Sequence, residues 1–270
     1  MQEQDKNILY IFNGDCAYQA WQKVTGGSAE ALVWREVYLE GPLPADCPLE
    51  DFELARAEYL HTLVPEYPVE NLRRYLLNLD RRLLSLTAQD TLLLYFDCCM
   101  YDMVMLARIM FLLKNTPATV HLFCEDAVLG NETELYTRPV TAFPRVSGEE
   151  IAIFADAWQA ILHGPEAGAE FNRSAPALQI PFLTEAMIRY GEDHPADGSM
   201  GKSHRRLLHL VCRENLHAFP EIFRAFNAGE KYPFLGDTSC KLLLNTLVTQ
   251  GHIVNTGTAD MPYYAAPPNR

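Results

Sequence analysis

The sequence predicts an α/β fold: a Rossmann-like three-layer domain with a parallel sheet, followed by a mainly helical, winged-helix-like domain. Short apolar runs alternate with amphipathic stretches over the first half of the chain. These runs are apolar throughout, as in strands that are covered on both faces. After Pro144 such runs stop until near the C-terminal end. We therefore expect a Rossmann-like domain over residues 1–145, a helical domain over 146–258 and an extended tail over 259–270.

Four of the apolar runs are the expected strands of the sheet. Each run is too short for a helix, and the first is closed by the turn Asn13-Gly14. Strands of this kind that are joined through helices indicate parallel neighbours, because a parallel connection needs a crossover. The strands are expected at Ile8–Phe12, Ala31–Trp34, Thr91–Phe96 and Thr119–Cys124.

Helices are expected where apolar residues recur at three- and four-residue intervals. In the first domain these stretches are Cys16–Val24, Leu49–Val64, Val69–Leu86 and Tyr101–Lys114. In the second domain they are Gly148–His163, Pro181–Glu192, Ser203–Arg213, Pro220–Ala228 and Asp237–Thr249, with Asp237 as the expected N-cap of the last. Three short helices followed by a β-turn near 252–257 are typical of a winged helix.

Composition limits the class of protein. The 270 residues are 49% apolar and 21% charged, which is ordinary globular composition. The formal net charge of −13 excludes a general basic coat for nucleic acid or anionic membranes, because such a field repels phosphate. Seven cysteines without a CxxC pair predict reduced thiols, no disulfide framework and no metal site. With no apolar stretch of signal or membrane length, we expect a cytoplasmic protein with no membrane partner.

Polar residues directly after the expected strands form the candidate ligand site: Asp15, Arg35, Glu36 and Asp97. In an open parallel sheet the ligand crevice lies outside the carboxyl ends of the strands, so these side chains are placed to converge there. Such a group can bind a divalent cation, act as acid and base, or hold a hydroxylated or phosphorylated ligand. The alternative is structural: Asp15 and Asp97 cap helices, and Glu36 pairs with a surface cation such as Arg35.

A small polar ligand of the nucleotide or sugar-phosphate class is therefore the leading functional hypothesis. The sequence leaves open whether the protein is an enzyme, and it names no cofactor. Cys16, at the expected start of the first helix, is a conceivable nucleophile because a helix N-terminus stabilises a thiolate. A packed, inert Cys is the commoner role.

The alternative hypothesis is a regulatory nucleic-acid-binding or protein-interaction adaptor that acts through the second domain. Residues 201–256 hold seven Lys or Arg against four acids, a local balance of 7 − 4 = +3. A winged helix with this surplus can place its last helix in a major groove. The candidate contact residues are Lys202, Arg205, Arg206 and Lys241.

Several short blocks, in order, resemble the bacterial family called domain of unknown function 1835. The N-terminal blocks are Asn13-Gly14-Asp15, Trp34-Arg35-Glu36 with Glu40-Gly41-Pro42, and Tyr95-Phe96-Asp97 through Tyr101-Asp102. Later blocks resemble the family's usual C-terminal partner domain: Pro181-Phe182-Leu183, Ala186, the helix after Gly201 and Phe234-Leu235-Gly236-Asp237-Thr238. The sequence has Cys16 where the family more often has Ser. The resemblance implies the two-domain architecture and no particular activity.

Overall fold

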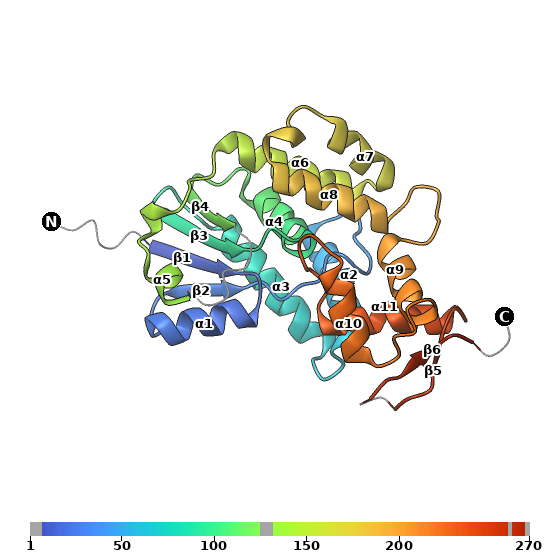
Figure 1. The fold of residues 1–270 in the computed structure, drawn as a ribbon. Coiled ribbons are helices and arrows are strands. Elements are labelled where there is room, and N and C mark those ends of the chain that lie inside the picture. Colours follow the sequence, from blue (N-terminus) through green and yellow to red (C-terminus); the bar gives the residue numbers. More distant parts are fainter. Residues whose placement is uncertain (1–6, 125–131, 259–260, 268–270) are drawn as a thin grey trace. The chain divides into compact units, whose positions relative to one another are not determined.

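The computed structural model describes residues 7–124, 132–258 and 261–267, and the chain divides into two compact units, Met1–Met187 and Ile188–Arg270 (Figure 1). The division falls within helix α8 (Pro181–Asp193). Within the described residues, no helix combines the length and the apolar character needed to cross a bilayer.

The first unit contains a four-stranded parallel sheet with the strand order β2-β1-β3-β4. This confirms the α/β class and the parallel sheet. In the register, Leu9 lies opposite Leu92, and Phe96 lies opposite Cys124. The strands are β1 (Asn7–Phe12), β2 (Glu30–Val33), β3 (Asp90–Phe96) and β4 (Thr119–Cys124).

Helices connect the strands and continue beyond them. The segment joining β2 to β3 contains two helices, as the sequence predicts, whereas the short α5 and α7 and the two 3₁₀ turns were not expected. The helices of this unit are α1 (Asp15–Thr25), α2 (Leu49–Leu63), α3 (Val69–Leu84), α4 (Met100–Leu113), α5 (Glu132–Thr137), α6 (Gly148–Leu162) and α7 (Pro165–Arg173), with turns η1 (Val140–Ala142) and η2 (Ala177–Gln179).

The two faces of the sheet carry different helices. Helix α1 packs with α5, and α3 packs with α4 (Figure 1). Because successive strand residues point to opposite faces, Phe12, Leu93 and Tyr95 enter one aromatic cluster with Trp21 of α1 and Leu135 of α5. This cluster lies beneath the carboxyl ends of β1 and β3.

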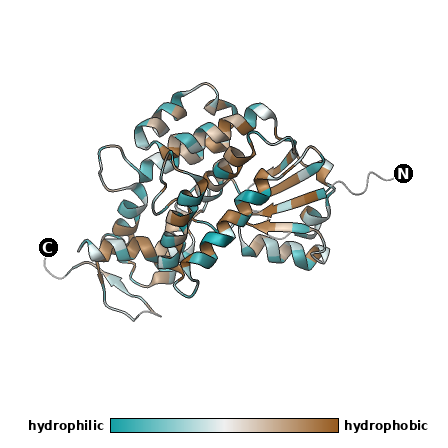
Figure 2. Cartoon of the chain, turned by 180° about the vertical axis from the view of Figure 1, so that it is seen from behind, coloured by the Kyte–Doolittle hydropathy of each residue, from teal (hydrophilic) through white to brown (hydrophobic). Residues whose placement is uncertain are grey.

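Helix α4 is buried along almost its whole length, as expected for a helix that is apolar on all sides. One reason is that α6 packs against it. Hydrophobic residues also dominate the strands of the sheet (Figure 2). The first unit is therefore longer than the expected domain 1–145, because α6 covers α4 and α7 packs against α6.

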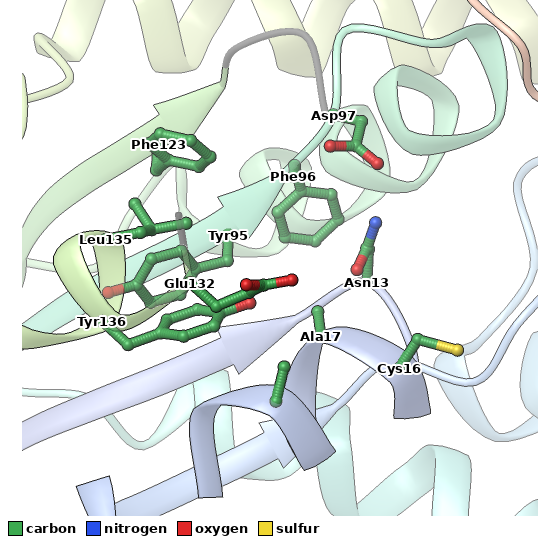
Figure 3. A pocket seen from close by; sticks show the side chains of 11 residues that line it. Asn13, Cys16, Ala17, Tyr95, Phe96, Asp97, Phe123, Glu132, Leu135 and Tyr136 are labelled. Atoms are coloured by element: carbon green, nitrogen blue, oxygen red, sulfur yellow. The ribbon is translucent and has the colours of Figure 1, made fainter. Parts of the chain in front are cut away.

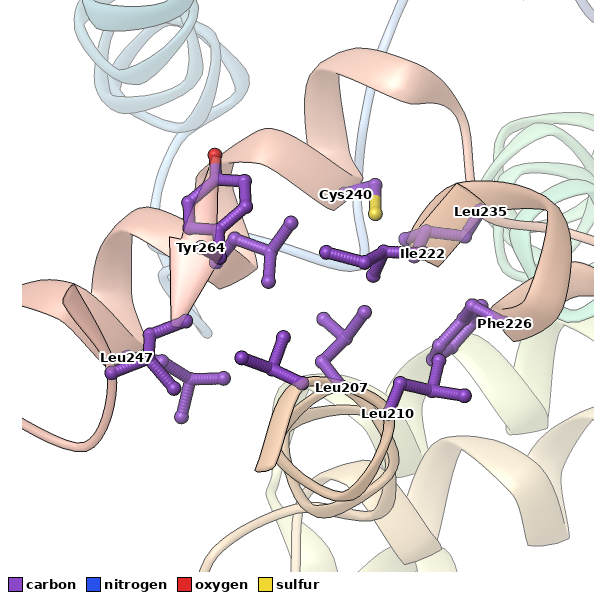
Figure 4. Packing of buried hydrophobic residues seen from close by; sticks show 11 residues of the cluster. Leu207, Leu210, Ile222, Phe226, Leu235, Cys240, Leu247 and Tyr264 are labelled. Atoms are coloured by element: carbon purple, nitrogen blue, oxygen red, sulfur yellow. The ribbon is translucent and has the colours of Figure 1, made fainter. Parts of the chain in front are cut away.

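The second unit contains α9 (Lys202–Cys212), α10 (Phe219–Ala228), α11 (Asp237–Thr249) and an antiparallel pair of short strands, β5 (Val254–Asn255) and β6 (Tyr264–Ala265). The three helices share one hydrophobic core, in which Leu207, Phe226 and Leu244 are fully buried (Figure 4). Each helix contributes an apolar face to that core, which fixes their mutual packing.

One detail of this unit differs from the sequence-based expectations: Gly236 is the N-cap of α11, and Asp237 is the first helical residue with no capping side-chain bond. Within the expected extended tail, Tyr264 pairs opposite Asn255 and is only 1% exposed. The tail residues 259–260 and 268–270 lie outside the described residues.

Candidate functional site

A cleft of about 200 Å³ opens at the carboxyl ends of β1, β3 and β4 (Figure 3). Its walls come from the loops after β1 and β3, from the first turns of α1 and from α5. The lining residues are Asn13, Cys16, Ala17, Ala20, Tyr95, Phe96, Asp97, Phe123, Glu132, Leu135 and Tyr136.

The strand order explains why a cleft forms here. The chain leaves β1 through α1 toward β2 on one side, and it leaves β3 through α4 toward β4 on the other. Neighbouring strands whose connections run in opposite directions leave a crevice between the connecting segments, and ligands of open α/β sheets bind at this switch point. The loops that begin at Asn13 and Asp97 border that crevice.

Asp102, on the first turn of α4, ties these two loops together beneath the cleft. The Asn13 side-chain amide donates to Asp102 Oδ2 at 2.5 Å, and the Asp97 backbone N–H donates to the same oxygen at 2.6 Å. Burial raises the pKa of Asp102 to about 7, although both donors favour its ionised form. Because the Asn13 amide nitrogen is engaged, its Oδ1 is left to accept a hydrogen bond from a ligand.

Two carboxylates contribute acceptors to the cleft. Asp97 comes from the loop after β3, and Glu132 comes from the first turn of α5. In Figure 3 the Glu132 carboxylate points across the cleft toward Asn13, and the Asp97 carboxylate lies above Asn13. The three side chains therefore form a polar end suited to hydroxyl and amine donors.

Aromatic rings form the opposite wall. The Tyr95 ring packs edge-on against Tyr136, with the ring centroids 5.2 Å apart, and it also contacts Phe123. Burial raises the pKa of both tyrosine hydroxyls, so they remain protonated donors near neutral pH. The cleft thus places aromatic side chains beside a polar end, an arrangement that suits a ligand with both apolar and hydroxyl groups.

Asp15 and Arg35 lie together, but their side chains pair with each other instead of lining the cleft. Three hydrogen bonds of 2.6 to 3.0 Å join the Arg35 guanidinium to the Asp15 carboxylate, and both side chains are 49% exposed. The hydrogen bond from Arg35 lowers the pKa of Asp15. Gly14 is the N-cap of α1, so Asp15 does not cap this helix through its side chain.

The Glu36 side chain does not line the cleft, and this corrects its place in the expected site. Its side chain is fully buried in an ion pair with Arg56 of α2. Burial raises the pKa of Glu36 against the opposing effect of Arg56. The physical reason is the burial of Arg56, which donates to three backbone carbonyls of the loop after β2. A buried guanidinium is stable only beside a buried negative charge, and Glu36 supplies it. The structural alternative, a pair with Arg35 or another surface cation, was also wrong, since the partner is Arg56 and both side chains are buried.

Of the residues predicted from the sequence as ligand-site or nucleophile candidates, Asp97 and Cys16 line this cleft. Cys16 is exposed at its edge. Asp97 does not cap α4, whose N-cap is Cys99. The sequence reasoning missed Asn13, Glu132, Tyr136 and the supporting Asp102. Asn13 had a usable signal, since it directly follows the first strand.

The residues expected to contact nucleic acid have partners within the second unit. Lys202 pairs with Glu192, Arg206 with Glu214 and Lys241 with Asp237. Arg205 donates to the Met200 carbonyl. Glu214 and Asp237 are already counted in the balance of +3 for residues 201–256, so of these three ion pairs only the one with Glu192 lowers it further.

Within the described residues, no cluster of three or more His, Cys, Asp or Glu side chains is arranged to hold a metal ion. No protein-family model matches the sequence, and no curated protein or solved structure matches it.

Proposed function

We propose that the first unit binds a small polar ligand of the nucleotide or sugar-phosphate class in the cleft between the loops after β1 and β3. The observation that carries the proposal is the position of Asn13, Asp97 and Glu132 around a cleft at the switch point of the sheet. Carboxylate and amide oxygens accept hydrogen bonds from vicinal hydroxyls, and the partly buried ring of Tyr136 offers an aromatic contact beside them.

The size of the cleft supports a compact ligand. About 200 Å³ lies below the roughly 300 to 1,000 Å³ typical of drug-sized sites, so a single sugar or the sugar of a nucleotide fits better than a whole dinucleotide. The phosphate of such a ligand would lie at the N-terminus of α1, which begins at the same edge of the sheet. The first N–H groups of this helix have no side-chain cap and can donate to phosphate oxygens.

A thermal-shift screen tests this proposal with nucleoside monophosphates, nucleosides, sugar phosphates and inorganic phosphate as separate probes. A ligand at 100 times its Kd stabilises the fold by about 2.7 kcal/mol. Asp97→Asn and Glu132→Gln should fold normally and lose the shift given by the sugar-bearing probes. Glu66→Gln, which removes an exposed carboxylate elsewhere in the unit, is the matched control and should keep it. A shift that survives both cleft substitutions contradicts the proposed site.

We propose as a second candidate that the second unit is a winged-helix-like module for nucleic acid or protein. The order of α9, α10, α11 and the β5–β6 pair supports it. If it binds nucleic acid through three or four phosphates, gel-shift affinities should fall with salt at a log-log slope of about −3. Lys202→Glu combined with Arg205→Glu should weaken binding to all nucleic-acid sequences, and Lys23→Glu in the first unit should leave binding unchanged. If no complex forms at low salt with duplex DNA, single-stranded DNA or RNA, nucleic-acid binding is excluded and the protein-interaction role is the one left.

Kinship with the family called domain of unknown function 1835 is also a proposal, and it rests on the blocks quoted above. Two of those blocks have a structural role here: Glu36 and the Glu40-Gly41-Pro42 loop are both held by Arg56. An alignment in which family members keep a basic residue at the position of Arg56 would support the kinship, and a variable residue there would oppose it.

A further inference from the structure

Two cysteines meet at the edge of the sheet beside the cleft. Cys98 lies in the loop after β3, and Cys124 is the last residue of β4. Their sulfur atoms are 3.1 Å apart. Both residues are partly buried, so the pair lies near the surface without being fully open to solvent.

The backbone at this point suits a covalent link. Strands β3 and β4 are hydrogen-bonded neighbours, with Phe96 opposite Cys124, so Cys98 lies just beyond the paired region. A disulfide needs its sulfurs at about 2.05 Å, which here requires an approach of about 1 Å. Side-chain rotation or a small shift of the loop supplies that distance, because the loop end is not held in the ladder.

The two thiols differ in their surroundings. The hydrogen bond between them and burial both raise the pKa of Cys124. Either sulfur can be the donor in this contact. Because a thiolate is the attacking form of cysteine and Cys124 is held protonated, the first attack on an oxidant is assigned to Cys98. Cys124 is already in place as the thiol that completes the bond.

We propose that Cys98 and Cys124 form a reversible redox-modification site whose substrate is a hydroperoxide. The Cys98 thiolate attacks one peroxide oxygen, the O–O bond breaks, and a sulfenic acid forms with release of water or an alcohol. The Cys124 thiol then attacks the Cys98 sulfur, an S–S bond forms, and the oxygen of the sulfenic acid leaves as water. Two thiols lose two electrons in total, and the peroxide bond takes them up.

The link would fasten the two strand ends that border the cleft. Cys98 follows Asp97 and Cys124 follows Phe123, and both of these neighbours line the cleft. Oxidation therefore fixes one edge of the cleft, whatever ligand it holds. The inference does not depend on the proposed ligand, because the disulfide can form in its absence.

Peptide mapping of the full chain tests the proposal. The reduced protein is treated with one equivalent of hydrogen peroxide, denatured and alkylated. Two of its seven thiols should escape alkylation, and one linked peptide pair should join Cys98 to Cys124 and disappear with dithiothreitol. The protein should also gain several degrees in Tm, since the link restricts the unfolded chain.

Matched variants assign the bond. Cys98→Ser and Cys124→Ser should lose the linked pair, whereas Cys99→Ser and Cys47→Ser should retain it. If the first two fail to fold, the wild-type peptide map decides alone. The proposal is overturned if all seven thiols remain alkylatable, if the link joins other cysteines, or if Cys98 reaches a sulfinic acid while Cys124 stays alkylatable.

Discussion

Arg56 grips Glu36 through two parallel hydrogen bonds, from Nε at 2.6 Å and from Nη2 at 3.0 Å, and neither side chain is exposed to solvent. The remaining guanidinium N–H groups donate to the backbone carbonyls of Val37, Glu40 and Pro42. One buried arginine on α2 thus holds the loop that follows β2, because each of its guanidinium N–H groups donates to an acceptor in that loop.

Removing this arginine should be costly. Arg56→Ala leaves the Glu36 carboxylate buried without a counter-charge, which costs about 3 to 5 kcal/mol in comparable cases. Arg35→Ala is the matched control, because its half-exposed pair with Asp15 is worth about 0 to 1 kcal/mol. Urea unfolding of both variants measures the difference. Equal losses in the free energy of unfolding would mean that the buried Arg56–Glu36 pair stabilises the fold no more than the exposed Arg35–Asp15 pair.

The buried cluster around Arg108 should make stability depend on pH. Arg108 contacts Asp80 at 2.7 Å and Glu53 at 3.1 Å, so two carboxylates share one cation. Burial and the neighbouring Asp80 raise the pKa of Glu53 from 4.5 to about 8. The folded state therefore holds a proton that the unfolded chain releases, and the free energy of unfolding should fall as pH rises from about 4.5 to about 8.

Glu53→Gln should flatten that slope, because the amide keeps a donor and an acceptor but does not titrate. Glu50→Gln, on the exposed side of the same helix, should leave the slope unchanged. Denaturation midpoints between pH 5 and pH 8 decide the matter. A wild-type slope that persists in Glu53→Gln would place the titrating proton elsewhere.

Asp102 permits a similar comparison beside the cleft. Asp102→Asn keeps an oxygen that can accept from Asn13 and from the Asp97 N–H, so it should fold with near wild-type stability. Since the folded pKa of about 7 lies above the ordinary 3.8, Asp102 should contribute to the loss of stability between those values as pH rises. Asp102→Asn should remove that contribution and keep the one from Glu53. Asp102→Ala leaves buried donors without an acceptor and should cost about 1 to 3 kcal/mol. Equal stability of the Ala and Asn variants would argue against this bridging role.

Gly41 is required by space as well as by backbone conformation. Its φ is +76°, and a Cβ placed there would lie 2.4 Å from the Tyr59 ring. Gly41→Ala should therefore destabilise the protein by more than about 1 kcal/mol. Gly148→Ala, at a helix start with nothing within 4 Å, should be neutral or stabilising by up to about 1 kcal/mol. Thermal unfolding compares the two, and a tolerated Gly41→Ala would mean that the loop can move away from Tyr59.

Sequence reasoning succeeded where the signal is local. Residues such as Leu92, Leu93 and Leu94 form an uninterrupted apolar run, and that run predicts a buried parallel strand. Asp97 was placed at the sheet edge by the same logic, because a residue that follows a strand must lie at its carboxyl end. The fold class and one wall of the cleft are accessible in this way.

The other features of the site and of the domain boundary depend on contacts between residues far apart in the sequence, which a local sequence pattern does not reveal. Glu36 and Arg56 are 20 residues apart, so nothing near Glu36 indicates that it turns inward. Glu132 stands on a helix of six residues, too short to give a periodic signal. The limit of the first unit was missed for a related reason, since only tertiary packing shows that α6 covers α4.

The burial of α4 has a practical consequence for dissecting the protein. A fragment ending near residue 145 would keep the sheet and leave out α6, and the face of α4 that α6 covers would meet water. An apolar helix face newly exposed in this way promotes self-association and precipitation. A fragment meant to contain the first unit should therefore retain α6, so that its boundary is set by the helix that covers α4 and not by the end of the sheet.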